Sequence, residues 1–250
     1  MRKSASSSLT IICPRRTETG CLNRDGAMAT HLLFPARSAH VLPVRLPWEQ
    51  AALVEPTAVA YRGVRAGDVA GRTVCVLGAG PVGLQAAQAA RSLGAASVAV
   101  ADVEERRLAT AAEVGIAHRV ALPGGTADGA AAAREVFPEG AEVVVECSGA
   151  PAAVGLAVEV ARNGGRIVQI GLSGKLDVPV YMDRLVTKEV TLAGSVSSPG
   201  VWPEVIDLVS RGEIRTAPLV THRFPFEQVE DAILALRERS PETVKVSLVA

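Results

Sequence analysis

A glycine-rich turn stands between two segments of regular pattern. The letters GAGPVG, residues 78–83, follow an apolar run at Thr73–Leu77 and open an expected helix over Pro81–Leu93. Glycines alone make many ordinary turns, but the GxGxxG spacing between a strand and a helix is typical of a dinucleotide-binding turn. This setting therefore predicts a nucleotide-binding domain built around residues 73–93.

Each glycine of the turn has a separate task in such a site. Gly78 permits the tight turn, Gly80 lets the backbone approach a pyrophosphate, and Gly83 lets the helix pack closely on the strand. The first N–H groups of the helix and its partial positive charge would bind the pyrophosphate. Pro81 suits the first helical turn, because its missing N–H leaves no bond unmade there.

A carboxylate follows at the spacing that this kind of site requires. Asp102 comes at the end of the next expected strand, Ser97–Ala101, about 20 residues after Gly80. Such a carboxylate accepts hydrogen bonds from the adenosine ribose and repels a 2′-phosphate, so the sequence favours NAD over NADP. Two alternatives stay open: Asp102 could cap the helix that follows, and Arg106 or Arg107 could accommodate a 2′-phosphate.

Short apolar runs alternate with helical stretches from Thr73 onward. This order predicts βαβ units and a parallel sheet covered by helices on both faces. Continuous apolar runs such as residues 74–77 and 143–145 agree, because strands of such sheets are buried on both sides. We expect a doubly wound α/β sheet with strands at 73–77, 97–101, 119–122, 142–146, 166–170 and 189–193, and helices at 81–93, 104–114, 127–136, 151–162 and 205–210.

The two flanks of this alternating region differ from it. Residues before about Tyr61 are rich in turn-forming prolines. Residues 1–20 are rich in Ser, Thr and Arg, and we expect them to be poorly ordered or not native to the fold. After Arg211 the pattern predicts a strand at 219–224, a helix at 226–237 and a strand at 244–249.

The charge balance limits the partners of the chain. Lys and Arg number 26 and Asp and Glu number 26, and a neutral chain lacks the clustered positive surface that nucleic acid requires. No apolar run reaches the roughly 20 residues that span a bilayer. Cys75 and Cys147 lie in apolar runs, which favours small core residues over disulfides and fits a reducing compartment. We therefore expect a cytoplasmic protein without a nucleic-acid or membrane partner.

Three further strand ends contain small, turn-forming residues, at 147–149, 170–172 and 194–198. In a doubly wound sheet, ligands bind outside the carboxyl ends of the strands, so these segments are candidates for cofactor contacts. Ordinary βα turns are the alternative at each place taken alone. Their joint position above the sheet favours the binding function.

Several segments together resemble the medium-chain, zinc-dependent alcohol dehydrogenase family. The resemblance is carried by VCVLGAGPVG at 74–83, ECSG at 146–149 and GRIVQIGL at 165–172. The segment ALVEPTAVA at 52–60 is similar to the branch of sorbitol or polyol, butanediol and threonine dehydrogenases. The resemblance runs from about Cys21 to the C-terminus.

The resemblance implies a fold, a cofactor and a domain plan. It implies a Rossmann domain over 61–211 that binds NAD, remnants of a β-rich GroES-like catalytic domain over 21–60, and a segment over 212–250 that returns to that domain. It also implies an N-terminally truncated chain, because the family places a longer catalytic domain before the part seen here. Together with the glycine-rich turn, the cofactor positions are Gly78, Gly80, Pro81, Val82, Gly83, Asp102, Arg107, Cys147, Ile170, Gly171, Leu172, Val196, Ser197 and Ser198.

The zinc ligands of the family are largely missing from the sequence. Glu55 matches a carboxylate near the catalytic zinc or its water, and it is the one candidate for a catalytic or metal-binding residue. A catalytic zinc needs three protein ligands, and the sequence contains no Gly-His-Glu and no cluster of four cysteines. His31 and His40 are the nearest imidazoles, but without ligand spacing they are better explained as structural residues.

The resemblance implies a dehydrogenase that transfers hydride from a secondary alcohol, such as a polyol, to NAD, with zinc polarising the alkoxide in intact relatives. It also implies a homodimer or homotetramer. Because the zinc ligands are missing, a catalytically inactive NAD(H)-binding fragment or paralogue is the second hypothesis. A methyltransferase-like fold with another adenosine ligand is the third, and the ECSG and GRIVQIGL segments speak against it.

Overall fold

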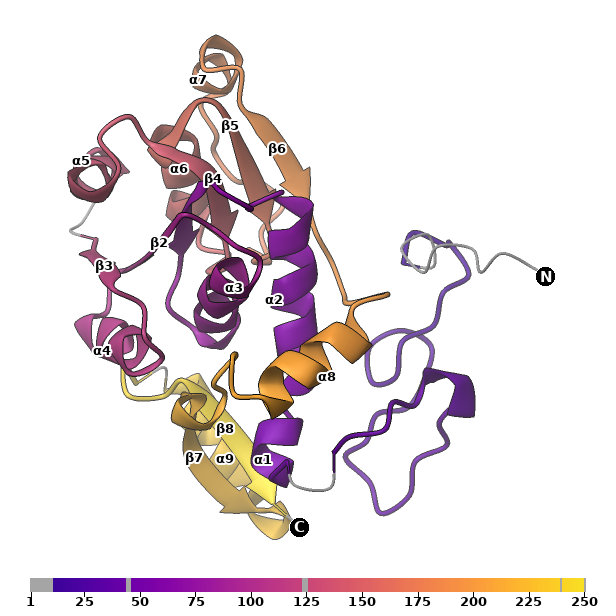
Figure 1. Ribbon diagram of the computed structural model, residues 1–250. Helices are drawn as coiled ribbons and strands as arrows, with labels where there is room; N and C mark the ends of the chain where they lie inside the picture. Colours follow the sequence, from indigo (N-terminus) through magenta and orange to yellow (C-terminus); the bar gives the residue numbers. More distant parts are fainter. Residues whose placement is uncertain (1–10, 44–45, 123–125, 239, 250) are drawn as a thin grey trace.

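The computed structural model describes residues 11–43, 46–122, 126–238 and 240–249. Its strands are β1 (Thr73–Leu77), β2 (Ser97–Asp102), β3 (His118–Ala121), β4 (Ala141–Glu146), β5 (Ala161–Gln169), β6 (Thr191–Gly194), β7 (Val220–Pro225) and β8 (Lys245–Val249). The first six form one parallel sheet in the order β3-β2-β1-β4-β5-β6 (Figure 1). The expected doubly wound sheet is confirmed, and its order reverses between β1 and β4, the point at which such sheets bind ligands.

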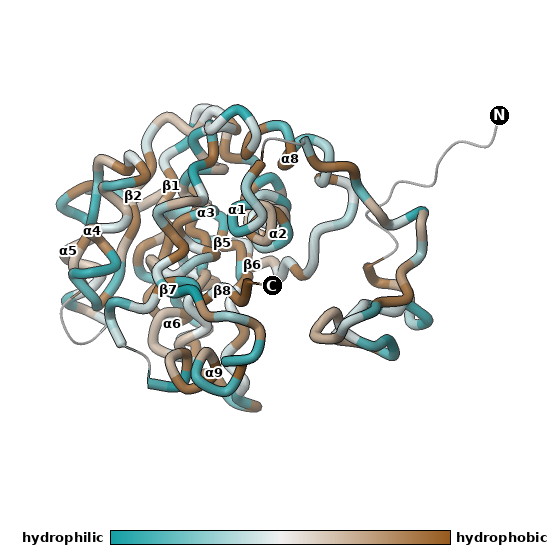
Figure 2. Tube along the Cα trace, turned by 90° about the horizontal axis from the view of Figure 1, so that it is seen from below, coloured by the Kyte–Doolittle hydropathy of each residue, from teal (hydrophilic) through white to brown (hydrophobic). Residues whose placement is uncertain are grey.

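Helices cover both faces of this sheet. They are α2 (Val54–Ala66), α3 (Pro81–Ser92), α4 (Glu105–Glu113), α5 (Thr126–Val136), α6 (Pro151–Val160), α7 (Met182–Thr187) and α8 (Trp202–Ser210). Along β1, Val74 and Val76 belong to a buried cluster with α2, α3, α4 and α8, whereas Cys75 and Leu77 belong to a second cluster with α5 and α6. Figure 2 shows hydrophobic segments in the interior between these helices. Burial of both faces explains why β1 is apolar from Val74 to Leu77.

The junction of α6 and β5 differs from the sequence prediction. The helix expected to reach Arg162 ends at Val160, and Ala161 already has extended dihedral angles (φ −60°, ψ 138°). Ala161 pairs with Ala141 of β4, and an irregularity in the pairing follows. The N–H of Gly164 then donates to a backbone carbonyl that follows α7, at 2.7 Å. This contact joins distant segments, so local sequence pattern does not reveal it.

Strand β6 begins two residues later than the sequence predicts. Glu189 has a left-handed backbone (φ 52°), which turns the chain after α7. Pairing with β5 therefore starts only at Thr191. Helix α7 itself has only 6 residues, and the sequence pattern does not predict it.

Helix α2 crosses the domain boundary expected between residues 60 and 61. Pro56 lies in its first turn, where a missing N–H breaks no intrahelical hydrogen bond. Ala58, Ala60 and Val64 are fully buried in the same cluster as α3. Residues 54–60 therefore pack with the sheet domain, and Leu42 and Leu46 of the preceding segment pack against the same cluster.

The two flanks lie outside the sheet. After α8 come β7, α9 (Val229–Arg237) and β8, the strand, helix and strand that the sequence predicts. The two strands pair in parallel beside the short helix α1 (Trp48–Ala51) (Figure 1). The segment before α1 extends away on one side as an arm that contains the 3₁₀ turn η2 (Ala36–Ser38).

Of the residues expected to be poorly ordered, 1–10 lie outside the described part, and 11–20 form turns with a bridge between Glu18 and Leu22. The other 3₁₀ turns are η3 (Ala217–Leu219) and η4 (Phe226–Gln228).

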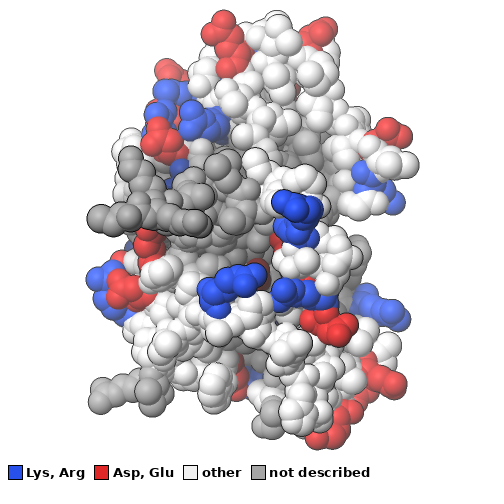
Figure 3. All heavy atoms as spheres, turned by 90° about the vertical axis from the view of Figure 1, so that its right-hand side faces the viewer, with Lys and Arg blue, Asp and Glu red and all other residues white. Residues whose placement is uncertain are grey.

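The charged side chains of the surface are mixed in sign. On the face seen in Figure 3, Lys and Arg side chains lie among Asp and Glu side chains and wide uncharged areas. Within the described ranges, no helix combines the length and the apolar character needed to cross a membrane.

Candidate nucleotide-binding site

The glycine-rich turn lies between the carboxyl ends of β1 and β2. Gly78 has a left-handed backbone (φ 99°), and its N–H donates to Ala101 O at 2.8 Å. A Cβ at Gly78 would lie 3.0 Å from Ser148, which follows β4, and a Cβ at Gly83 would overlap the carbonyl of Gly78. Both positions therefore require glycine for steric reasons, as the motif predicts.

Helix α3 begins beside open space at this turn. Its N-cap is Gly80, which offers no side-chain cap, and the first backbone bond runs from Leu84 N–H to Gly80 O at 2.9 Å. A Cβ on Gly80 would meet nothing within 4 Å. The N–H groups of Val82 and Gly83 lack intrahelical partners, so they can bind an anion that approaches Gly80.

Asp102 contacts the turn from the neighbouring strand. Its side chain is 5% exposed at the end of β2, and its carboxylate accepts a hydrogen bond from Ala79 N–H. It accepts a second from Glu104 N–H at 2.9 Å, but the N-cap of α4 is Glu104 itself, so Asp102 is not the helix cap that the sequence leaves open. Because each carboxylate oxygen has two acceptor sites, Asp102 can still accept hydrogen bonds from the hydroxyl groups of a ligand.

Arg107 lies near the start of α4. It is half-buried, and its buried Nε has no hydrogen-bond partner in the described part of the chain. Its neighbour Arg106 is exposed. A buried donor without a partner costs free energy, which makes Arg107 an unusual residue of this edge.

Two loops meet this edge from the ends of β4 and β5. The N–H of Cys147 donates to the last carbonyl of β1 at 2.9 Å, and the N–H of Ile170 donates to the carbonyl of Glu146 at 2.8 Å. A Cβ at Gly149 would overlap the carbonyl of Leu172, so the two loops are in contact. The predicted residues Cys147, Ile170, Gly171 and Leu172 therefore lie at the edge that holds the glycine-rich turn.

The third predicted loop follows β6 and is attached to α2. Arg62 donates to Ser195 Oγ at 3.1 Å and to Val196 O at 2.9 Å. Ser197 has a φ of 60°, uncommon for a residue with a side chain, and Ser198 is buried. Sequence reasoning missed Arg62, because its partners lie more than a hundred positions away along the chain.

The candidate zinc ligands do not come together. Glu55 is exposed in the first turn of α2, and the protein atoms around it raise the pKa of its carboxyl group by desolvation. His31 is exposed on the arm before α1, and His40 stacks on Trp202 with ring centroids 5.2 Å apart. In the described ranges, no group of three or more His, Cys, Asp or Glu side chains could hold a metal ion. The residues described therefore do not fit the catalytic zinc that the resemblance implies.

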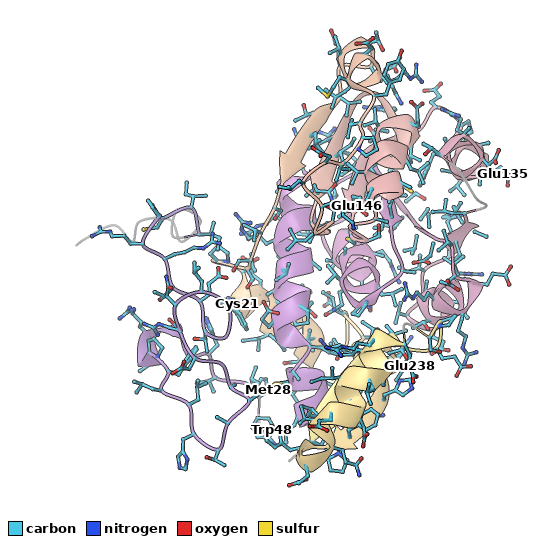
Figure 4. All side chains as sticks on the ribbon, turned by 180° about the vertical axis from the view of Figure 1, so that it is seen from behind. Cys21, Met28, Trp48, Glu135, Glu146 and Glu238 are labelled. Atoms are coloured by element: carbon cyan, nitrogen blue, oxygen red, sulfur yellow. The ribbon has the colours of Figure 1, made fainter. Side chains whose placement is uncertain are left out.

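Sequence reasoning also missed Glu146 as a residue of the site. Its side chain is fully buried at the end of β4. Figure 4 shows Glu146 on the side of α2 opposite to Cys21, which lies on the arm. Its place directly after three buried valines, at the carboxyl end of the strand, is the signal that points to it, because Glu is almost never fully buried without hydrogen-bond partners.

Comparison with known proteins gives one matching family model. Residues 81–211 match the model described as zinc-binding dehydrogenase. D-xylulose reductase of Saccharomyces cerevisiae is 34% identical over 221 residues, which are 86% of this chain and 61% of that protein. Sorbitol dehydrogenase of Gallus gallus is 33% identical over 229 residues, which are 90% and 63% of the two chains. The chain thus spans about three fifths of the length of these curated relatives.

A solved structure agrees in fold. A short chain alcohol dehydrogenase of E. coli CFT073, solved in complex with NADH, superposes with a TM-score of 0.83 and 27% identity. The match covers 92% of this chain and 67% of that one. The six-stranded sheet and its helices therefore have the arrangement found in dehydrogenase structures.

Proposed function

Because the chain belongs to the zinc-binding dehydrogenase family, we propose that it binds NAD(H) at the carboxyl edge of its sheet and forms the cofactor-binding part of an alcohol or polyol dehydrogenase. The observation that carries this proposal is the uncapped start of α3 beside the buried carboxylate of Asp102. An anion-binding helix end and a hydroxyl-binding carboxylate at one edge match the pyrophosphate and ribose of a dinucleotide.

Each part of the cofactor has residues suited to it. The N–H groups of Val82 and Gly83 would bind the pyrophosphate beside Gly80, and Asp102 would accept the adenosine ribose hydroxyls. Arg107, in the first turn of α4, would lie at the adenosine end. The loops at 147–149, 170–172 and 196–198 would hold the nicotinamide end, because a dinucleotide extends across the point where the strand order reverses.

The chemistry of the site is hydride transfer. When bound, NAD would supply a hydride acceptor at C4 of its nicotinamide ring, and a secondary alcohol that gives up a hydride to it and its hydroxyl proton to solvent becomes a ketone. The chain's own contribution is to bind and orient that ring on backbone loops held by Glu146 and Arg62. The described residues do not assemble the ligands of a catalytic zinc ion.

The proposed substrate class is a polyol or similar small alcohol, and the proposed assembly is a homodimer or homotetramer. The names of the relatives, D-xylulose reductase and sorbitol dehydrogenase, support the substrate class. A catalytically inactive NAD(H)-binding protein remains the second candidate, and the scattered positions of Glu55, His31 and His40 favour it.

We also propose that the flanking residues 21–53 and 212–250 belong to a second, catalytic unit beside the nucleotide-binding domain. Helix α9 supports this division, because its apolar side chains Ile233, Leu234 and Leu236 are 42%, 53% and 52% exposed. Side chains of this kind suit a surface that packs on further protein.

Two measurements on the chain test the proposal. NADH binding is followed by the change in its fluorescence, and NAD reduction is followed by absorbance with sorbitol, xylitol and butanediol, with and without added Zn²⁺. Saturable NADH binding with turnover supports the dehydrogenase, and saturable binding without turnover supports the inactive NAD(H)-binding protein. Absence of NADH binding contradicts both.

A further inference from the structure

Glu146 is a fully buried carboxylate whose contacts are all hydrogen bonds from neutral donors. Its Oε1 accepts from Ser148 N–H at 2.8 Å, from Ser148 Oγ–H and from Gly149 N–H at 3.0 Å. Its Oε2 accepts from Gln169 Nε2 and from Gly149 N–H at 3.1 Å. No ion pair in the described part of the chain includes it. A buried carboxylate of this kind depends on every one of its donors.

The same carboxylate joins two loops that are distant in sequence. Gln169 Nε2 donates to Glu146 and also to Gly171 O at 2.8 Å. A Cβ at Gly171 would lie 2.6 Å from Glu146 Oε2, so the β5 loop rests directly on the carboxylate. Glu146 therefore bonds the loop after β4 through Ser148 and Gly149, and the loop after β5 through Gln169.

These loops lie on one side of the glycine-rich turn. Ser148 is the nearest neighbour of a Cβ built on Gly78. Asp102 lies on the other side of the turn, at the end of β2, which is next to β1 in the sheet. If Asp102 marks the adenosine half of a dinucleotide, the loops held by Glu146 mark the nicotinamide half.

We propose that Glu146 is a positioning residue that shapes the nicotinamide half of the site by holding residues 147–149 and 170–172 on one carboxylate. This inference rests on the proposed NAD(H) binding. Replacement by Gln keeps the shape of the side chain but places an NH₂ group against either the N–H donors of the β4 loop or the amide of Gln169. One donor then faces another donor, and the loop must move.

Glu142 provides the matched control. It lies on the same strand, accepts Thr73 N–H at 2.8 Å and forms an ion pair with Arg162 at 3.0 Å. Its position is the amino end of β4, away from the carboxyl edge. If β4 needed a carboxylate only for stability, Glu142→Gln and Glu146→Gln would have the same effects. A positioning role predicts instead that only Glu146→Gln lowers the affinity for NADH.

The experiment compares Glu146→Gln and Glu142→Gln with the wild-type chain. Dissociation constants are measured for NADH and for ADP-ribose, which lacks the nicotinamide ring, and amide hydrogen exchange is followed in the ligand-free chains. We expect Glu146→Gln to weaken NADH binding about tenfold and ADP-ribose binding by no more than about twofold. Exchange should accelerate at 147–149 and 170–172. Glu142→Gln should change only the melting temperature.

Equal NADH affinity in Glu146→Gln and wild type, or equal loss of NADH and ADP-ribose, would overturn the inference. If the wild-type chain binds no NADH, the proposed function fails. The positioning role is tested independently of NADH, because unaltered hydrogen exchange at the two loops in Glu146→Gln would overturn it. If Glu146→Gln does not fold, Gln169→Met removes the bonds from Gln169 to Glu146 and to Gly171 O and leaves the bonds between Glu146 and the β4 loop in place. That variant should show the same selective loss of NADH, and wild-type NADH affinity in it would overturn the inference.

Discussion

The carboxylate of Asp102, at the end of β2, accepts a hydrogen bond from the backbone N–H of Ala79 in the middle of the glycine-rich turn. The same carboxylate accepts the N–H of Glu104 at 2.9 Å at the start of α4. The turn suited to a pyrophosphate and the carboxylate suited to a ribose are therefore one hydrogen-bonded unit. Such a site is organised before a ligand arrives, which lowers the cost of ordering it on binding.

Asp102→Asn tests this unit. The amide nitrogen of Asn would face the N–H of either Ala79 or Glu104, and the negative charge offered to the ribose would be lost. We expect the dissociation constant for NADH to rise about tenfold or more, measured by fluorescence titration. Asp128→Asn, at an exposed position of α5, is the matched control and should bind like wild type. Wild-type affinity in Asp102→Asn would refute the role of this carboxylate.

Gly83→Ala tests the close packing of α3 on the turn. Its Cβ would overlap the carbonyl of Gly78, so the start of the helix must move away. We expect a lower melting temperature and weaker NADH binding. Gly155→Ala in α6 is the control, because its Cβ would lie 3.7 Å from Pro179 O, an ordinary contact. This second change should stabilise the chain by about 0.5–1 kcal/mol through helix propensity. Equal stability of the two variants would contradict the steric argument.

The cysteines should differ in reactivity. Burial without a charged partner raises the pKa of the Cys75 thiol to about 12, whereas Cys21 is exposed. Because the thiolate is the reactive form, iodoacetamide at mildly alkaline pH should modify Cys21 in the native chain and Cys75 only after unfolding. Mass spectrometry of the modified peptides measures this directly. Modification of Cys75 at the rate of Cys21 in the native chain would show that β1 is not the buried central strand.

Glu159 gives a predicted dependence of stability on pH. A hydrogen bond from Arg184, supported by its charge, holds the pKa of Glu159 below its usual value of 4.5 despite partial burial. A carboxyl with a lowered folded-state pKa contributes stability above the unfolded-state value, and this contribution is lost as the pH falls through the folded-state value. Glu159→Gln should therefore lower the melting temperature at neutral pH and have progressively less effect in acid. Exposed Glu105→Gln is the control. An effect of Glu159→Gln that persists unchanged in acid would argue against this ion pair.

Local signals predict much of the sheet. Strand β1 ends at Leu77 as expected because Gly78 follows it, and α3 begins at Pro81 because proline and the preceding glycine favour a helix start. Helix α2 is not predicted, because a proline such as Pro56 indicates a turn when only the sequence is known. In the structure Pro56 lies in the first turn of the helix, where proline is compatible with helical geometry. The end of α6 is set by the pairing of Ala161 with Ala141, a contact that the sequence around it does not encode.

The residues of the candidate site also include some that the sequence predicts and some that it does not. Gly78, Gly83 and Asp102 follow from spacing alone, because one short βαβ segment contains them all. Arg62 and Glu146 do not, because their tasks depend on loops of other strands that only the folded chain brings to them. Residues that bind by local motif are thus predictable, whereas residues that position the loops are found from the structure.

Titration of the chain with NADH by isothermal calorimetry tests the central claim most directly. The account predicts saturable binding at one site per chain, weakened about tenfold in Asp102→Asn and unchanged in Asp128→Asn. Absence of saturable binding, or equal affinity in the wild type and Asp102→Asn, would contradict it.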